Sequence, residues 1–444
     1  MTQKTPYSFK TLGLYCLPAI PLASTTTPLL NLMPAFYAQE VGIPLATIGI
    51  ILLSMRALDV ITDTLIGTLS DRTALPGWRR KIWMAAGAPV FACGIYFLFT
   101  PPDGAGPLYL TTLTIMTYLG WTMLQIPYQA WGAELSGDYN ERSRIAGYRE
   151  IATVIGILLA LSIPFITSFF GHGIDRTTMT WVGILIAVLI FPSVAIAVAT
   201  VPEPVVVKRQ ERLTLKQSMT LLVQNKPFRF FFVFAVIIFT GNAFLSSSFV
   251  LYVTHYIGSP TIIGPVYLLY YGLILAAIHP MVLISRRFGK HRTTAAATLL
   301  WCLFFFCIAL LPPGSVTGFV TLMLVSALPA SAGLTLPVAI LADVIDYDTL
   351  RSGQNRTGLY FAIWSMIQKG SAALGIGVAL PLLAALGFSA TGENDTQGLN
   401  AIRFVGFGLS IIPYIAGSVL LWFFPLDARR QDIIARRLAR RASK

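Results

Sequence analysis

Two aspartates four residues apart are the residues of this sequence best suited to chemistry. Asp59 and Asp63 lie within an apolar stretch of membrane-spanning length, and Arg56 precedes the first of them by three residues. Spacings of three and four place these side chains on one face of a helix. Carboxylates within a bilayer are costly and usually belong to an ion or substrate path. The stretch therefore predicts a cation site; the alternative is a structural pair neutralised by Arg56 and Lys369.

The coupling ion stays open at this stage. Carboxylate and hydroxyl oxygens suit Na+, and two acids held close together can instead share a proton. Lys369 lies near the middle of a later apolar stretch, where an ammonium group needs a carboxylate partner. We expect that partner to be Asp59 or Asp63. Neither a phosphate-binding loop nor a paired-histidine metal motif occurs in the sequence, so we expect neither an ATP-driven pump nor a membrane metalloenzyme, and no cofactor besides the coupling ion.

The composition is that of a membrane protein. Hydrophobic residues make up 55% of the chain and charged residues 11%, and the mean hydropathy is +0.71. In soluble domains about a quarter of all residues are charged. The net charge of +13 lies in short loops between apolar stretches and not in a basic domain. This pattern indicates membrane topology and makes nucleic acid an unexpected partner.

We predict an all-α integral membrane protein with twelve transmembrane helices, because a helix needs about 20 apolar residues to cross a bilayer. The stretches that satisfy this length are 11–37, 44–70, 81–100, 107–135, 144–170, 179–201, 228–257, 260–285, 293–312, 316–347, 356–388 and 399–425. The first stretch contains Pro18, Pro21, Pro28 and Pro34, which should kink it.

Basic residues concentrate in alternate loops and in both tails, whereas the intervening loops hold only Arg176 and Arg403. This asymmetry predicts that both termini lie in the cytoplasm. We expect the membrane to be the cell inner membrane. The longest cytoplasmic connection divides the spans six and six. We therefore expect a bundle over 1–201, a central loop over 202–227, a second bundle over 228–425 and a basic tail over 426–444. We expect the protein to be a monomer.

The two halves also resemble each other. Ser70-Asp71-Arg72 with Arg79-Arg80-Lys81 follows the second span, and Ser285-Arg286-Arg287-Phe288-Gly289-Lys290 follows the eighth. Arg144 and Tyr148 in one half are matched by Arg356 and Tyr360 in the other. These similarities favour a duplicated six-helix unit with a solute site between the halves, near the middle of the membrane.

The run Arg56-Ala-Leu-Asp59-Val-Ile-Thr-Asp63 resembles the glycoside–pentoside–hexuronide:cation symporter family, to which the melibiose permease belongs. Further stretches that carry the resemblance are Ile126-Pro127-Tyr128, Tyr148-Arg149, and Ala342-Asp343-Val344-Ile345-Asp346-Tyr347 ahead of Lys369-Gly370. The resemblance implies the major facilitator fold, in which two six-helix bundles rock around a central site. It also implies symport of a sugar or glycoside with Na+ or H+.

The resemblance further implies roles for single residues. Asp59 and Asp63 would coordinate the cation together with the hydroxyl of Thr122. Lys369 would lie beside this site, and Arg149 would belong to the sugar and charge network.

The solute half of the motif departs from the family. Gln125 stands where melibiose-type members have Asp, and Gln129 stands where they have a sugar-stacking Trp. Leu334 replaces another Trp, and residues 11–37 contain no carboxylate. Galactosides are therefore not the expected solute. An amphipathic or lysolipid-like solute, or another non-sugar organic solute, is the alternative to a sugar.

Two further groups of residues complete the predicted site. The residues expected to bind solute are Gln125, Tyr128, Gln129, Arg149, Trp364 and Ser365, for which helix packing is the alternative role. The residues expected to couple or gate transport are Arg56, Lys369, Asp71, Arg72, Asp343, Asp346 and Arg351. We expect Asp71 to pair with basic groups of the other bundle and to close the inner face.

Overall fold

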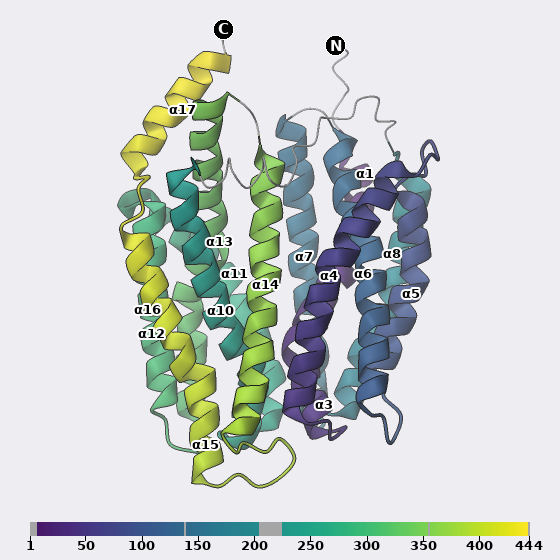
Figure 1. Ribbon diagram of the computed structural model, residues 1–444, viewed down its shortest axis with the longest axis vertical. Coiled ribbons are helices and arrows are strands. Elements are labelled where there is room, and N and C mark those ends of the chain that lie inside the picture. The colour runs from purple at the N-terminus through teal and green to yellow at the C-terminus, as the bar shows by residue number, and fades with distance from the viewer. Residues whose placement is uncertain (1–6, 137–138, 204–223, 354–355, 443–444) are drawn as a thin grey trace. The chain divides into compact units, whose positions relative to one another are not determined.

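The structure is a computed structural model that describes residues 7–136, 139–203, 224–353 and 356–442. Over these residues the chain is almost wholly helical and forms no strand, which confirms the expected all-α class. Two compact units divide the chain (Figure 1). Unit 1 comprises residues 1–210, 260–268 and 390–393, and unit 2 comprises 211–259, 269–389 and 394–444. The bundle and loop boundaries predicted from the sequence stay a prediction, and residues 204–223 of the central loop lie outside the described residues.

Within the described residues, ten helices are long and apolar enough to cross a membrane, and each coincides with a predicted span. Their bounds are Leu45–Arg72, Lys81–Phe99, Gly147–Ser168, Arg176–Thr200, Lys226–His255, Pro260–Phe288, Lys290–Ala309, Val316–Ser352, Leu359–Ala385 and Thr396–Trp422. The predicted span 107–135 is the continuous helix α6 (Pro107–Leu135).

The first predicted span is a chain of short helical pieces. They are α1 (Phe9–Cys16), α2 (Ala19–Thr27), a π-helical turn (Pro28–Leu32) and α3 (Met33–Gln39). Pro18 immediately precedes α2, and Pro28 begins the π-helical turn. Proline lacks the backbone N–H and clashes with the preceding turn, so a helix breaks or widens where it occurs. The span is thus interrupted at Pro18 and Pro28, whereas Pro21 lies within α2 and Pro34 within α3.

Unit 1 is a bundle in which α6 lies between α4 (Leu45–Arg72) and α5 (Lys81–Phe99). α5 also packs against α8 (Arg176–Thr200), and α2 packs against α7 (Tyr139–Ser168). The contact between α5 and α6 depends on Gly120, because a Cβ atom there would lie 2.5 Å from the backbone nitrogen of Phe91. Small residues allow helix backbones to approach closely in membranes. This contact holds α6 in the position from which Thr122 reaches α4.

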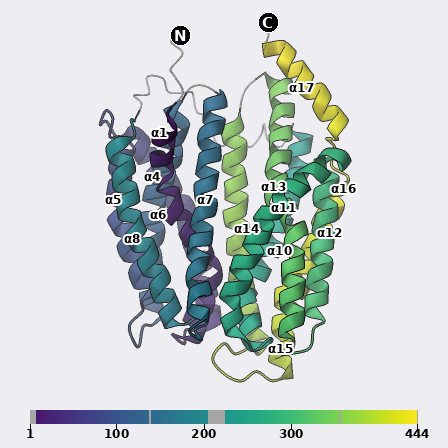
Figure 2. The same ribbon diagram turned by 180° about the vertical axis from the view of Figure 1, so that it is seen from behind.

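Unit 2 is built around α10, which packs against α14 and α16, while α12 packs against α13 and α16. Figure 2 shows α11, α12 and α13 from behind. The helices that lie wholly in this unit are α10 (Lys226–His255), α12 (Lys290–Ala309), α13 (Val316–Ser352), α14 (Thr357–Ala385), α15 (Thr396–Arg403), the π-helical turn Phe404–Gly408 and α16 (Leu409–Trp422). Helix α11 (Ile263–Phe288) begins in unit 1 and belongs to unit 2 from residue 269 on. A last helix, α17 (Ala428–Ala442), packs against α13.

Candidate cation and solute sites

Two side chains of α6 contact the predicted cation group of α4: Thr122 contacts Asp63, and Tyr118 contacts Arg56. Asp59 is buried, and its Oδ2 lies 3.2 Å from Nη1 of Arg56, one turn earlier on the same helix. The Arg56 guanidinium also lies over the ring of Tyr118 on α6, 5.0 Å from the ring centre. The spacing of three predicted from the sequence thus forms an ion pair, and Arg56 compensates the charge of Asp59.

Asp63 and Thr122 meet across the same helix pair. The Thr122 hydroxyl donates to Oδ1 of Asp63 at 3.0 Å, and Thr122 itself is buried. Tyr118 lies one helical turn before Thr122, so α6 presents an aromatic ring and a hydroxyl to the two carboxylates of α4. Two carboxylates and a hydroxyl are hard oxygen donors, which suit a small cation.

The described residues contain no group of three or more His, Cys, Asp or Glu side chains that could hold a metal ion. The donors that Asp59, Asp63 and Thr122 offer are all oxygens, which suit a hard cation better than a soft transition metal.

Two of the residues predicted to bind solute, Tyr128 and Arg149, share an environment with a residue that sequence reasoning missed. Tyr15 of α1 donates its hydroxyl to the backbone carbonyl of Tyr128 at 3.1 Å, and the two rings stack with centres 4.8 Å apart. Arg149 of α7 lies within electrostatic range of Tyr15 and Tyr128. Tyr15 lies in the proline-rich first span. The one sequence signal for it is a hydroxyl group within an otherwise apolar stretch.

The other predicted solute residues of unit 1 are more open. Gln129 is exposed and Gln125 is partly exposed, whereas Tyr128 is fully buried. Arg149 is partly exposed and lies 3.6 Å from the exposed carboxylate of Glu150. The polar side of α6 thus presents amide groups, and the aromatic side is packed within unit 1.

In unit 2, Trp364 is a core residue. Its indole stacks on Phe231 with centres 5.3 Å apart and meets the edge of Phe239 at 5.0 Å. It is 9% exposed and belongs to the main apolar cluster of this unit. Ser365 beside it is exposed, and Lys369, one turn further along α14, is partly exposed. Because Lys369 belongs to unit 2, its pairing with Asp59 or Asp63 stays a prediction.

A network of charges joins the ends of α4, α5 and α6. Arg80 lies 2.5 Å from Asp71 and 2.8 Å from Glu134, and Arg79 lies 2.6 Å from the other oxygen of Glu134. The Glu203 carboxylate accepts the backbone N–H of Arg80 at 2.7 Å. Sequence reasoning named Asp71 but missed Glu134 and Glu203, which are single acids at the ends of apolar stretches. Arg72 is exposed, and pairing of Asp71 with the other bundle stays a prediction.

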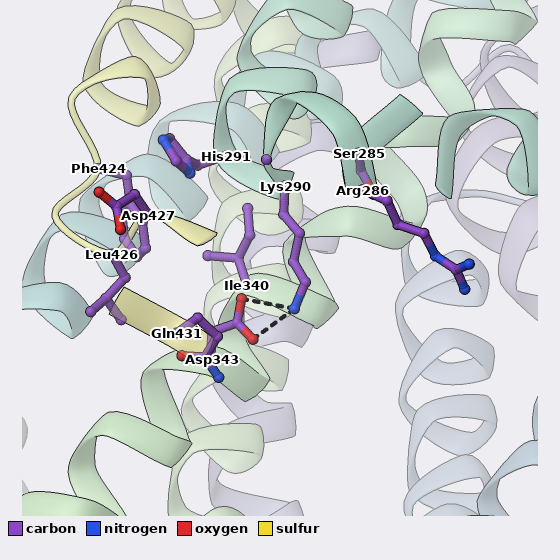
Figure 3. A pocket seen from close by; sticks show the side chains of 11 residues that line it. Ser285, Arg286, Lys290, His291, Ile340, Asp343, Phe424, Leu426, Asp427 and Gln431 are labelled. Atoms are coloured by element: carbon purple, nitrogen blue, oxygen red, sulfur yellow. Dashed lines mark hydrogen bonds and ion pairs between the residues drawn. The ribbon is translucent and has the colours of Figure 1, made fainter. Parts of the chain in front are cut away.

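The corresponding end of unit 2 has an equivalent ion pair. Nζ of Lys290, the first residue of α12, lies 2.6 and 2.8 Å from the two carboxylate oxygens of Asp343 on α13 (Figure 3). The pair lines a cavity of about 200 Å³ together with residues of the turn between α16 and α17. Asp346 accepts a hydrogen bond from Gln431 of α17 at 3.0 Å, and Arg351 donates to the backbone carbonyl of Gln224 at 3.2 Å.

Each unit therefore pairs a cation at the start of one helix with an acid on the next. Arg80 with Glu134 and Lys290 with Asp343 occupy corresponding places in the two halves. The repeated basic runs noted in the sequence thus have the same structural use in both units.

Comparison with known proteins agrees with this architecture. The isoprimeverose transporter of Lactiplantibacillus pentosus is 25% identical, over 90% of this chain and 85% of its own. The glucuronide carrier protein homolog of Escherichia coli (strain K12) is 22% identical, over 90% of this chain and 89% of its own. Among solved structures, the D-xylose-proton symporter aligns with a TM-score of 0.68 at 13% identity, covering 94% of this chain and 98% of that one.

The nucleoside transporter NupG aligns with a TM-score of 0.69 at 14% identity, over 93% of this chain and 99% of that one. At this identity the solved structures establish only that the fold is shared. The family described as "MFS/sugar transport protein" matches residues 14–428, nearly the whole chain, and confirms the resemblance carried by the motifs. The chain is therefore an integral, multi-pass membrane transporter, not an enzyme, and belongs to the MFS/sugar transport protein family.

Proposed function

We propose that this protein is a secondary active transporter that couples uptake of a sugar- or glycoside-type solute to a cation by alternating access. The observation that carries the proposal is the group formed by Arg56, Asp59, Asp63 and Thr122 within unit 1. Relatives named as an isoprimeverose transporter and a glucuronide carrier homolog support the solute class.

The cation is bound by the oxygens of Asp59, Asp63 and Thr122 in this proposal. Arg56 holds Asp59 in place and keeps the local charge low when the site is empty, since a second uncompensated carboxylate would be costly in the membrane. Cation entry neutralises the remaining charge and lowers the free-energy cost of closing the site off from water while access to it alternates. Na+ fits these oxygen donors, and H+ can neutralise the same carboxylates.

The solute is bound near Arg149 and the amides of Gln125 and Gln129. A planar guanidinium can donate two hydrogen bonds to neighbouring hydroxyls of a sugar. Lys369 responds to cation occupancy in this scheme and so links the two bundles. The protein lies in the cell inner membrane with both termini in the cytoplasm, because the basic loops and tails lie on one side of the predicted spans.

The test is the thermal stability of the purified protein in Na+, Li+ and K+ over a pH series. A ligand that binds only the folded state stabilises it, by about 2.7 kcal/mol at a hundred times its dissociation constant. We expect a Na+-specific rise in melting temperature if Na+ is the coupling ion. A rise on acidification without a Na+ response would identify H+ instead. The absence of both responses would contradict the cation site.

Variants show which residues the cation-dependent rise in melting temperature depends on. Asp63→Asn should keep the hydrogen bond from Thr122 and the basal melting temperature but lose the cation response. Asp59→Asn should lose the response and also lower the basal melting temperature, because Arg56 is then left without its carboxylate partner. Glu150→Gln removes an exposed acid of α7 and is the matched control. A full cation response in Asp63→Asn would show that the site lies elsewhere.

A further inference from the structure

The C-terminal helix α17 has one face fixed on unit 2. Ile434 is 7% exposed, and it and Leu438 pack on the apolar cluster of that unit. Gln431 donates to Asp346 of α13 at 3.0 Å. These three residues are spaced three and four apart, so they share one side of the helix. Their contacts set the rotation of α17 about its axis and therefore decide which residues face away from the protein.

The outward face of α17 is basic with an apolar residue at its centre. Ile433 is 44% exposed. Arg430, Arg436 and Arg437 lie three or four residues from it, on the same face, and are exposed as well. Arg436 pairs with Asp432 at 2.6 Å. An apolar side chain among arginines is typical of helices that lie at a membrane surface.

Independent features place this helix at the edge of the bilayer. The apolar helix that precedes it ends at Trp422. Trp422 and Phe423 are 46% and 72% exposed, and the Arg292 guanidinium lies 6.0 Å from the Trp422 ring centre. Exposed aromatic rings beside arginines at the ends of membrane helices mark the membrane–water interface. α17 begins at Ala428, shortly after these two aromatic residues, and slants from the end of α16 towards the end of α13, against which it packs (Figures 1 and 2).

We propose that the outward face of α17, together with Arg292, binds the headgroups of anionic phospholipids in the adjacent leaflet. Arginine forms bidentate hydrogen bonds with phosphate, and Ile433 can enter the boundary between headgroups and acyl chains. A soluble polyanion such as nucleic acid would have no use for Ile433 or for the exposed aromatics beside the helix. The proposal does not depend on the solute or on the coupling ion.

The test uses the full-length protein purified in a neutral detergent, with phosphatidylglycerol or phosphatidylcholine added and bound lipid counted by native mass spectrometry. We expect the wild type to retain phosphatidylglycerol at least about tenfold better than phosphatidylcholine, because each basic residue near an anionic surface strengthens binding roughly fivefold. The variant R430Q/R436Q/R437Q should lose most of this preference. The matched control R209Q/R212Q/K216Q removes three positive charges from the central loop and should keep it.

A second variant separates lipid binding from simple attraction of anions. Ile433→Asn leaves the charge unchanged and should weaken retention of phosphatidylglycerol several-fold, with the melting temperature in phosphatidylcholine unaltered. An equal preference in the wild type and in R430Q/R436Q/R437Q would overturn the proposal, as would an equal loss in the control. Displacement of the lipid by millimolar inorganic phosphate or by single-stranded DNA would also overturn it, because the face would then bind any anion.

Discussion

At the scale of single residues, the two aspartates of α4 have different surroundings although they lie one turn apart. Asp59 is compensated by Arg56, a cation on its own helix, whereas Asp63 accepts a hydrogen bond from Thr122, a neutral hydroxyl on another helix. When α4 and α6 move relative to each other, the distance between Arg56 and Asp59 stays the same because both lie on α4. The distance between Thr122 and Asp63 can change, because these residues lie on different helices. The hydrogen bond to Asp63 is therefore the contact through which cation binding can report on the packing of α4 against α6.

The Thr122 hydroxyl is expected to set cation affinity. Thr122→Ala should raise the cation concentration for half-maximal stabilisation about tenfold, because a hydrogen bond to a charged group contributes about 1.5–3 kcal/mol. Thr122→Ser keeps the hydroxyl and should restore the wild-type concentration. The measurement is the melting temperature as a function of cation concentration. Equal affinities in the alanine variant and the wild type would exclude Thr122 as a ligand.

At the scale of helices, the ion pairs at the helix ends of unit 1 differ from surface ion pairs in how deeply they are buried. The Arg80 side chain is 4% exposed, and it contacts both Asp71 and Glu134. Removing one partner of a buried pair leaves uncompensated charge and costs far more than loss of a surface pair. The network therefore fixes the ends of α4, α5 and α6 relative to one another.

Substitution of Arg80 tests this. Arg80→Gln should lower the free energy of unfolding by about 3–5 kcal/mol, since Asp71 and Glu134 lose their common partner. Arg72→Gln removes the same charge from an exposed position of α4 and should leave the melting temperature near that of the wild type. Thermal unfolding in a single detergent compares the two. Similar melting temperatures for both variants would show that the network contributes no stability.

The contact between α5 and α6 makes a second prediction at this scale. Gly120→Ala places a methyl group against the backbone of Phe91 and should destabilise the protein by about 1–3 kcal/mol through overpacking. Because α6 also carries Thr122, cation affinity should fall in the same variant.

The control for Gly120 is Gly147→Ala on α7, where an added Cβ meets open space. This change should be neutral or slightly stabilising, because alanine favours a helix over glycine by about 0.8–1.0 kcal/mol. Both variants are compared with the wild type by thermal unfolding and by cation titration. Equal effects at the two positions would mean that close packing at Gly120 is unimportant.

At the scale of the whole molecule, the expected orientation follows from the charges of the loops. Green fluorescent protein fused after Lys444 should fluoresce, and alkaline phosphatase fused there should be inactive, because the basic charge of the tail predicts that it stays in the cytoplasm. Fusions truncated after Asp175, in a loop with few basic residues, should give the opposite result. Active phosphatase at the C-terminus would reverse the orientation and with it the proposed direction of the cation path.

The sequence by itself determined the class of protein, ten of the membrane-spanning helices and the shared helix face of Arg56, Asp59 and Asp63. The binding of a cation there stays a prediction. Apolar length predicts membrane helices without knowledge of their neighbours, and prolines predict the breaks in the first of them. Helical periodicity places Arg56, Asp59 and Asp63 on one face, since residues three and four apart always meet on a helix. These inferences succeeded because they depend on interactions within a few residues.

Only the tertiary structure decided which distant residues meet. Tyr15 lies beside Tyr128 and near Arg149, Arg80 pairs with Glu134, and these partners are far apart in the chain. Trp364 packs in the apolar cluster of unit 2, where it stacks on Phe231, and its role in solute binding stays a prediction. Such contacts depend on how whole helices pack and rotate against one another, and the local periodicity of a single helix does not contain that information.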